Sequence, residues 1–215
     1  MFLDMSILNF NLDEIEKCLT PIRPWIPILH MDIMDGKFVK QTSFGTDIVR
    51  RSKNVCNLAI FDVHLMCVNP EELFMEYKDA GADYITFHYE TGNVVENINK
   101  IHSMGLKAGL SINPDTDVKV LIPYLKDIDT VLIMSVFPGL GGQKFIESSI
   151  EKVKFLKEYK DKNNLHYLIN IDGGINMETY KYVKPYCDLA VVGSAITRCE
   201  NYIETYINYL KAFSM

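Results

Sequence analysis

The chain has 215 residues, and 22 lysine and arginine residues against 28 aspartate and glutamate residues give a formal net charge of −6. Hydrophobic residues make up 48% and charged residues 23%, a balance that is typical of a soluble globular protein and excludes a disordered chain. This length predicts a single domain over residues 1–215. The acidic charge argues against nucleic acid and against an anionic membrane surface as partners.

The cysteines and the first twenty residues indicate the compartment. The five cysteines are widely spaced and include no Cys-x-x-Cys pair, so the sequence predicts neither a disulfide framework nor a thiolate zinc site. Asp4, Asp13, Glu14 and Glu16 interrupt any signal-peptide core. No apolar run approaches the ~18 residues that span a bilayer. We therefore expect a cytoplasmic protein.

Short apolar runs alternate with longer amphipathic runs along the chain. The strand-like runs are Leu3–Leu8, Ile26–Ile33, Leu58–Leu65, Tyr84–His88, Lys107–Ile112, Thr130–Val136, Tyr167–Ile171 and Leu189–Val192. The helix-like runs are Leu12–Leu19, Pro70–Ala80, Val94–Met104, Val118–Leu125, Ile146–Tyr159, Met177–Val183 and Asn201–Phe213. The pattern around Asp47–Lys53, between the second and third strands, is the weakest of the helical patterns.

The number and order of these runs predict the fold. Strands that are apolar on both faces and alternate with helices are typical of a parallel sheet covered by helices. Eight such units close as a (β/α)8 barrel, the TIM barrel, and 215 residues lie near the compact end of its size range. An open doubly wound sheet is the alternative. We predict the α/β barrel, whose functional residues project from the carboxyl ends of its strands.

Histidine and aspartate residues gather at three of these strand ends. His30 and Asp32 share one face of the second strand, and Asp62 and His64 share one face of the third, because alternate residues of a strand point the same way. Asp172 ends the seventh strand. One such residue alone would more often be hydrogen-bonded structure, but together they indicate a divalent-metal site. Mixed imidazole and carboxylate ligands suit Zn, Fe, Mn or Co better than Ca or Mg, and the spacing leaves Asp62 and His64 equivalent as candidates.

Glycine-rich loops follow the sixth, seventh and eighth strands. Glycine lets backbone N–H groups approach a phosphate closely, and a helix N-terminus behind such a loop adds a positive dipole end. In TIM barrels the loops after strands seven and eight are the usual phosphate cradle. None of these loops contains Lys or Arg, so we expect backbone amides to hold a phosphate. The candidate phosphate-binding residues are Gly139, Leu140, Gly141, Gly142, Gly173, Gly174, Gly193 and Ser194.

Three methionines, Met34, Met66 and Met134, lie near the strand ends that carry the candidate ligands. Their soft side chains could wall a reacting carbon off from water, whereas ordinary core packing explains most methionines. We include them among the candidate substrate-binding residues.

Taken together and in order, these segments resemble the ribulose-phosphate 3-epimerase family. The resembling stretches are Met5–Leu8, His30–Gly36, Asp62–Met66, Gly81–Asp83, Phe87-His88, Asn113–Thr116, Pro138–Phe145, Asp172–Ile175 and Val192–Ser194. The resemblance implies a TIM barrel of the ribulose-phosphate-binding type and a metal-dependent isomerase of the pentose phosphate pathway. Its reaction would interconvert D-ribulose 5-phosphate and D-xylulose 5-phosphate through an enediolate.

The resemblance also implies roles for individual residues. The implied metal ligands are His30, Asp32, His64 and Asp172, which chooses His64 over Asp62. Asp32 and Asp172 would also form the acid–base pair that removes a proton from one face of carbon 3 and returns one on the other. Ser6 and His64 would contact the substrate, and the glycine loops would hold its phosphate.

Some loop residues depart from those usual in the family: Lys37, Lys40-Gln41, Phe137 and Leu140. None is an implied ligand or acid–base group, so they bear on substrate preference more than on chemistry. The segment Lys37–Gly45 could act as a lid.

Other functions fit the same pattern. They are an epimerase of a six-carbon phosphoketose such as allulose 6-phosphate, a phosphosugar decarboxylase or lyase, and a non-catalytic phosphosugar-binding barrel. His88 and Glu90 could line the site, but packing or support of the ligands is favoured. Barrels of this family commonly assemble, which is compatible with a homo-oligomer.

Overall fold

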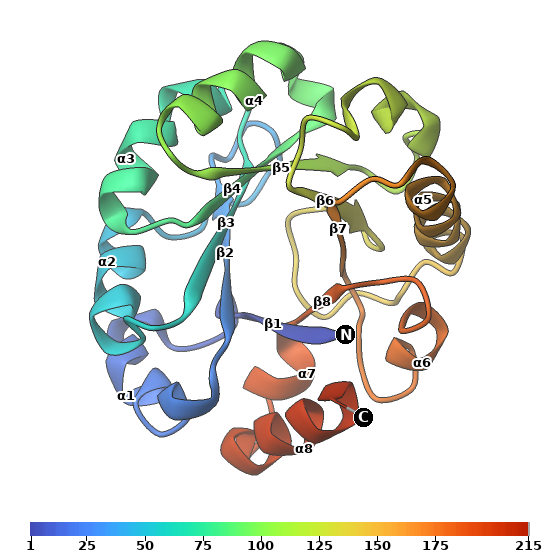
Figure 1. Ribbon diagram of the computed structural model, residues 1–215. Coiled ribbons are helices and arrows are strands. Elements are labelled where there is room, and N and C mark those ends of the chain that lie inside the picture. Colours follow the sequence, from blue (N-terminus) through green and yellow to red (C-terminus); the bar gives the residue numbers. More distant parts are fainter. Residues whose placement is uncertain (215) are drawn as a thin grey trace.

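The structure is a computed structural model that describes residues 1–214. Its eight strands are hydrogen-bonded in sequence order and the last pairs with the first, so the parallel sheet closes into a barrel (Figure 1). The strands are β1 (Phe2–Ser6), β2 (Ile28–Met34), β3 (Ile60–Met66), β4 (Tyr84–His88), β5 (Lys107–Ile112), β6 (Thr130–Met134), β7 (Leu168–Asp172) and β8 (Leu189–Val192). The predicted TIM barrel is confirmed, and the open doubly wound sheet is wrong.

Helices surround the barrel (Figure 1). The α-helices are α1 (Ile15–Leu19), α2 (Thr46–Val55), α3 (Phe74–Ala80), α4 (Val94–Ser103), α5 (Ser149–Asn163), α6 (Tyr180–Val183), α7 (Ser194–Thr197) and α8 (Tyr202–Ser214). The 3-10 segments are η1 (Leu12–Glu14), η2 (Arg23–Trp25), η3 (Pro70–Glu72), η4 (Tyr89–Thr91) and η5 (Val118–Tyr124).

One connection differs in kind from what the pattern suggests, and one is confirmed. The stretch around Asp47–Lys53, whose helical pattern is the weakest, forms the regular helix α2. The helix expected over Val118–Leu125 is instead the 3-10 segment η5. Pro123 lies inside it, and because proline lacks an N–H and its ring crowds the preceding turn, a regular α-helix cannot continue there.

The helices expected from Leu12 and Pro70 begin with the 3-10 segments η1 and η3, and two other helices begin later because the chain before them has other partners. The helix expected over Met177–Val183 begins at Tyr180, since the Asn176 side chain accepts hydrogen bonds from the backbone N–H groups two and three residues on. The helix expected from Ile146 begins at Ser149, because the N–H of Ile146 is bonded to the carbonyl of Ser135 at the end of the sixth strand.

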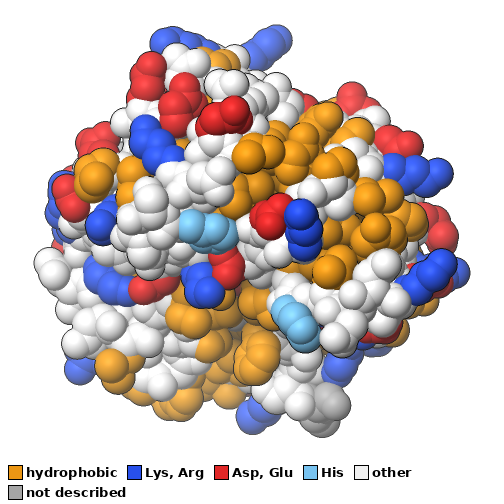
Figure 2. Space-filling model, turned by 45° about the horizontal axis from the view of Figure 1, so that its top comes forward, with side chains coloured by type: hydrophobic (Ala, Val, Ile, Leu, Met, Phe, Trp, Pro, Cys, Tyr) orange, Lys and Arg blue, Asp and Glu red, His pale blue; other side chains and the backbone are white. Residues whose placement is uncertain are grey.

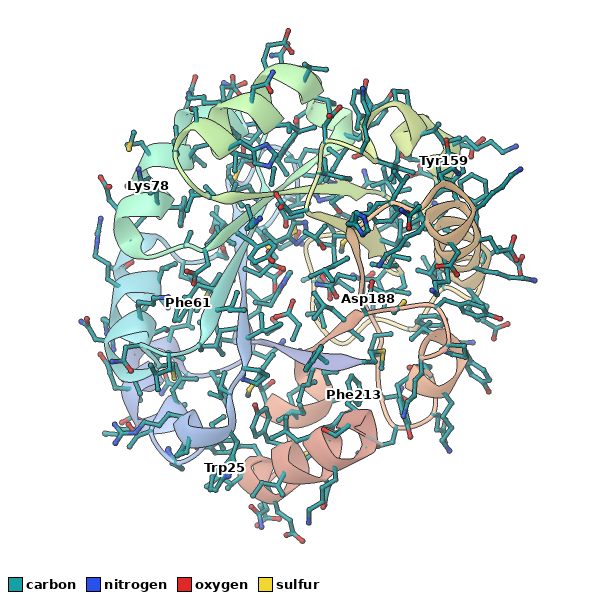
Figure 3. All side chains as sticks on the ribbon, viewed as in Figure 1. Trp25, Phe61, Lys78, Tyr159, Asp188 and Phe213 are labelled. Atoms are coloured by element: carbon teal, nitrogen blue, oxygen red, sulfur yellow. The ribbon has the colours of Figure 1, made fainter. Side chains whose placement is uncertain are left out.

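Strand alternation sorts the side chains of β2 between two environments. Leu29, Met31 and Ile33 pack in the large apolar layer between the sheet and the helices. Phe61 on β3 and Phe213 on α8 lie in the same layer (Figure 3). The β2 residues that alternate with Leu29, Met31 and Ile33, beginning with His30 and Asp32, are equally buried but belong to the polar barrel interior.

Polar groups are concentrated inside the barrel. The buried ones on the strands are Asp4, Ser6, His30, Asp32, Asp62, His64, Thr86, His88, Ser111, Thr130 and Asn170. Near β6 and β8 a small apolar cluster lies apart from the main core, formed by Leu132, Met134, Val136 and Val191. Buried polar groups destabilise a fold unless they are paired, so their concentration in one place indicates a functional site.

On the face shown in Figure 2, acidic and basic side chains are interspersed with apolar ones, and neither charge is concentrated in one place. An anionic ligand would therefore have to be attracted by local groups at its site. Within residues 1–214, no helix is both long and apolar enough to cross a membrane.

Candidate active site

A cleft opens at the carboxyl ends of the strands and gathers almost all of the residues singled out in the sequence. Its lining includes Ser6, Asp32, Met34, Met66, Met134, Gly139, Leu140, Gly141, Gly142, Asp172, Gly173, Gly174, Gly193 and Ser194. Of the residues expected to be ligands, acids or phosphate contacts, His30 and His64 are absent from this lining and are completely buried. Residues far apart in the sequence thus meet because each ends a strand of the same parallel barrel.

Four of these residues form a cluster with the composition of a metal site. His30, Asp32, His64 and Asp172 each present a ligand atom, and these atoms all lie within 4.8 Å of one another. Asp32 Oδ1 is 3.3 Å from His30 Nε2 and 3.3 Å from His64 Nδ1. His30 Nε2 is buried and has no hydrogen-bond partner, as expected of a nitrogen that faces a cation site. The donor set therefore fits a divalent metal ion.

The structure separates Asp62 from His64, which the spacing could not do. His64 turns its Nδ1 toward Asp32, whereas Asp62 lies beneath His30 and accepts a hydrogen bond from the Thr86 hydroxyl at 3.0 Å. Asp62 Oδ2 is 3.1 Å from His30 Nδ1, so this carboxylate supports the far side of the imidazole. Neutral imidazole coordinates metal best when its other nitrogen has such a partner.

Asp4 is a further support of His30 that the sequence pattern did not single out. Its Oδ2 lies 3.3 Å from His30 Nδ1 and accepts a hydrogen bond from the Asn170 side chain at 2.9 Å. Asp4, His30 and Asp62 form a second compact group of possible ligand atoms. Strand alternation could have found Asp4, because it is two residues before Ser6 and on the same face of β1.

The two carboxylates that face the cleft have pKa values displaced in opposite directions. Burial raises the pKa of Asp32, but the positive charge of His30 outweighs burial and holds it well below its ordinary value. Burial, together with the nearby charge of Asp32, raises the pKa of Asp172 to about 7. One acid is therefore ionised while the other carries a proton near neutrality.

The pKa values of the two histidines of the cluster are also displaced from their ordinary value. Burial lowers the pKa of His64 to about 4, which favours the neutral imidazole that a metal needs. For His30 burial acts in the same direction, but the Asp32 and Asp4 carboxylates outweigh it and raise the pKa well above its ordinary value. In the absence of a metal ion, a proton on His30 offsets part of the surrounding negative charge.

The glycine loops meet at the other end of the cleft and are packed against one another. A Cβ on Gly173 would lie 2.5 Å from the Val136 side chain, and one on Gly174 would lie 2.6 Å from the backbone nitrogen of Phe145. The Gln143 side chain bridges the β6 loop by donating to the carbonyls of Phe137 and Leu140 at 2.7 and 2.8 Å. Such close backbone packing requires glycine.

Arg198 lies beside this glycine cradle, although the loops themselves contain no basic residue. Its Nη2 donates to Asn9 Oδ1 at 2.8 Å, and Asn9 in turn lines the cleft beside Gly141. A basic side chain therefore lies next to the glycine loops, and the expectation that backbone amides hold a phosphate stays a prediction. The position of Arg198, one helical turn after Ser194, was the available signal.

The remaining residues of interest lie around the metal-ligand cluster. Met34, Met66 and Met134 are nearly buried and line the cleft, and Met134 is the register partner of Asp172. His88 is completely buried beside His64, so it supports the cluster and does not line the cleft. The ring of Phe38, from the loop after β2, lies 4.6 Å from that of His88, and a lid role for this loop stays a prediction.

Comparison with known proteins identifies the family. The model of the "Ribulose-phosphate 3 epimerase family" matches residues 2–197. The chain belongs to the ribulose-phosphate 3-epimerase family. It is 38% identical over 202 residues to the ribulose-phosphate 3-epimerase of Aquifex aeolicus, covering 93% of this chain and 90% of that one. It is 40% identical over 196 residues to the enzyme of the same name from Bacillus subtilis, covering 90% and 87%.

Family membership makes the chain an isomerase of the epimerase class. Solved structures extend the likeness of fold further. The crystal structure of 3-hexulose-6-phosphate synthase from Salmonella typhimurium aligns over 100% of this chain and 99% of that one, with a TM-score of 0.74 and 18% identity. At this identity the likeness concerns the barrel alone.

Proposed function

We propose that the protein interconverts D-ribulose 5-phosphate and D-xylulose 5-phosphate by moving a proton at carbon 3. The observation that carries the proposal is that two carboxylates, Asp32 and Asp172, line one cleft next to the ligand atoms of His30 and His64. Epimerisation needs a base on one face of carbon 3 and an acid on the other, and this pair supplies both. The family and its named relatives support the choice of substrate.

In the forward direction, Asp32 accepts the proton from carbon 3 and Asp172 donates its proton to the opposite face. The serine hydroxyl of Ser6 donates to Asp32 Oδ2 at 2.8 Å, which leaves Oδ1 to face the cluster and fixes the carboxylate. The reverse reaction begins from the opposite protonation states, so the two acids exchange roles. Before another forward turnover, the protons return to their first positions by exchange with solvent.

Between the two transfers the substrate is an enediolate whose negative charge must be stabilised. A divalent metal ion held by His30, Asp32, His64 and Asp172 would act there as a Lewis acid. The ligand types fit Zn, Fe, Mn or Co, and metal analysis of the purified protein would identify the ion. Met34, Met66 and Met134 exclude water from the reacting carbon.

The far end of the substrate is its phosphate, which the glycine loops would hold. The cleft lining includes Gly139–Gly142, Gly173, Gly174, Gly193 and Ser194. Their backbone N–H groups bind the phosphate oxygens, and Arg198 adds positive potential from the side. Binding energy at the phosphate positions carbon 3 between the two acids.

The test is conversion of ribulose 5-phosphate by the metal-loaded protein, read through transketolase. Asp32→Asn and Asp172→Asn preserve shape but remove one acid each, and we expect each to lower kcat by at least about a hundredfold. Asp127→Asn is the matched control, because Asp127 is exposed and lies outside the cleft. Near-full activity in either active-site variant would contradict the two-acid scheme.

Isotope exchange gives a second readout of the same scheme. In D2O the Asp172→Asn protein keeps Asp32 as a base, so it should exchange the carbon 3 hydrogen of one sugar without producing its epimer. Comparing kcat/KM for ribulose 5-phosphate and allulose 6-phosphate then measures the preference for a five-carbon substrate.

A further inference from the structure

Two buried imidazoles next to the cluster are joined through their nitrogens. His64 Nε2 and His88 Nε2 are 2.8 Å apart, and their rings are stacked with centroids 5.0 Å apart. Both side chains are completely buried. A hydrogen bond between two imidazole nitrogens requires a proton on one and a lone pair on the other. The direction of this bond therefore determines where each ring carries its proton.

Glu90 fixes that direction from the far side of His88. Glu90 Oε2 lies 3.3 Å from His88 Nδ1, and Glu90 Oε1 accepts hydrogen bonds from the backbone N–H of Asn113, at 2.8 Å, and from the Thr116 hydroxyl. An ionised carboxylate can only accept, so Glu90 favours a proton on His88 Nδ1, which His88 then donates to Glu90. Its Nε2 then has a lone pair, which accepts the Nε2 proton of His64.

The consequence appears at the other nitrogen of His64. With its proton on Nε2, neutral His64 presents the lone pair of Nδ1 toward Asp32 Oδ1, 3.3 Å away. Two acceptors facing each other at this distance repel unless a cation lies between them. The arrangement therefore prepares His64 Nδ1 for a metal ion.

The opposite direction would move the pair of facing acceptors from His64 and Asp32, inside the metal-ligand cluster, to His88 and Glu90, outside it. If His88 donated from Nε2, its Nδ1 lone pair would face the Glu90 carboxylate, and His64 would carry its proton on Nδ1. Both nitrogens of neutral His64 would then be occupied by hydrogen bonds, and neither could bind a metal.

We propose that Glu90 and His88 are positioning residues, which hold His64 in the tautomer that binds metal through Nδ1. This inference rests on the metal site of the proposed function. The chain of hydrogen bonds from Glu90 through His88 to His64, called the relay below, is itself held rigidly. Lys152 Nζ donates to the carbonyls of Asn113, Pro114 and Thr116 at 3.1, 2.7 and 2.7 Å, which fastens the loop that binds Glu90 to α5.

Glu90→Gln tests the relay because the amide can reverse it. The Oε1 position of Glu90 receives two donors, so the Gln carbonyl oxygen takes that place and its NH2 group faces His88 Nδ1. His88 then moves its proton to Nε2, and His64 must move its own to Nδ1. We expect Co2+ or Zn2+ affinity, measured by chelator competition without any sugar, to fall by about tenfold to a hundredfold.

Two controls separate positioning from loss of stability. Asp129→Asn removes a carboxylate that is 2.8 Å from the exposed His102, far from the cleft, and should lower stability without changing metal affinity. Glu90→Asp keeps an acceptor for His88 and should retain more affinity than Glu90→Gln. The Co2+ absorption spectrum should change in Glu90→Gln alone, because a ligand is lost.

The wild-type protein gives the decisive measurement without any substitution. Long-range 1H–15N NMR of the Zn2+-loaded protein should show His88 protonated at Nδ1 and His64 at Nε2. His88 protonated at Nε2, or unchanged metal affinity in folded Glu90→Gln protein, would overturn the inference. Failure to epimerise ribulose 5-phosphate would instead count against the proposed function, because neither the affinity nor the NMR measurement involves sugar.

Discussion

Gly174 offers a test of how the phosphate end of the cleft is built. Its φ is +66°, and a Cβ there would lie 2.6 Å from the nitrogen and 2.8 Å from the Cα of Phe145. Gly105 has a similar φ of +79°, but a Cβ there would meet nothing within 4 Å. The two glycines therefore share the left-handed backbone and differ in the space around it. Gly105→Ala is the matched control for Gly174→Ala.

The magnitudes follow from this difference. The left-handed conformation costs an alanine about 1–2 kcal/mol, and that cost is common to both variants. Crowding against a backbone that cannot turn aside adds about 1–3 kcal/mol for Gly174→Ala. Gly174→Ala should therefore unfold at a lower urea concentration than Gly105→Ala, with the difference in unfolding free energy equal to the crowding term.

KM for the phosphosugar should also change more in Gly174→Ala than in Gly105→Ala. Phe145 belongs to the segment that follows the β6 glycines, so relief of the crowding displaces that loop from the phosphate. If about 1.4 kcal/mol of this crowding energy weakens binding of the phosphosugar, its KM rises about tenfold. The assays are urea unfolding and steady-state kinetics. Equal stability and equal KM in the two variants would refute the close packing of the cradle.

Two further predictions concern charge at the site. Arg198→Met keeps the aliphatic stem but removes the cation beside Asn9. KM should therefore rise by about twofold to fivefold with little change in kcat, most clearly at low salt. A KM that changes neither with this substitution nor with salt concentration would remove Arg198 from phosphate binding. Metal affinity should increase with pH, because a metal ion must displace the proton of His30, for which the Asp32 and Asp4 carboxylates outweigh burial and raise the pKa well above its ordinary value. Between pH 6 and pH 8 this one proton accounts for a gain of about tenfold to a hundredfold, and chelator competition giving the same affinity at both pH values would contradict the raised pKa.

Much of the fold was predictable because the signals are local. A short apolar run depends only on neighbouring residues, and Tyr84–His88, Lys107–Ile112 and Leu189–Val192 have the bounds that the pattern predicts. The errors lie where a side chain competes with the helix. Pro123 inside η5 and the Asn176 side chain before α6 each change the local hydrogen bonding.

The candidate site was partly predictable for the same reason. Strand ends converge in a parallel barrel, so His30, Asp32 and Asp172 could be brought together from the sequence. The choice between Asp62 and His64 could not be made from spacing, because both point into the barrel. The depth of each residue along β3 decides it, and depth depends on the register with β2.

By itself, the sequence determined a closed barrel of eight strands, the gathering of acids and histidines at one end and the position of the glycine loops. The tertiary structure alone decided the contacts between elements distant in sequence. These include Arg198 beside the cradle, Asp4 beneath His30, and the hydrogen bonds from Glu90 through His88 to His64. The physical reason is that burial and distance set pKa values and tautomers, and both are properties of the packed barrel.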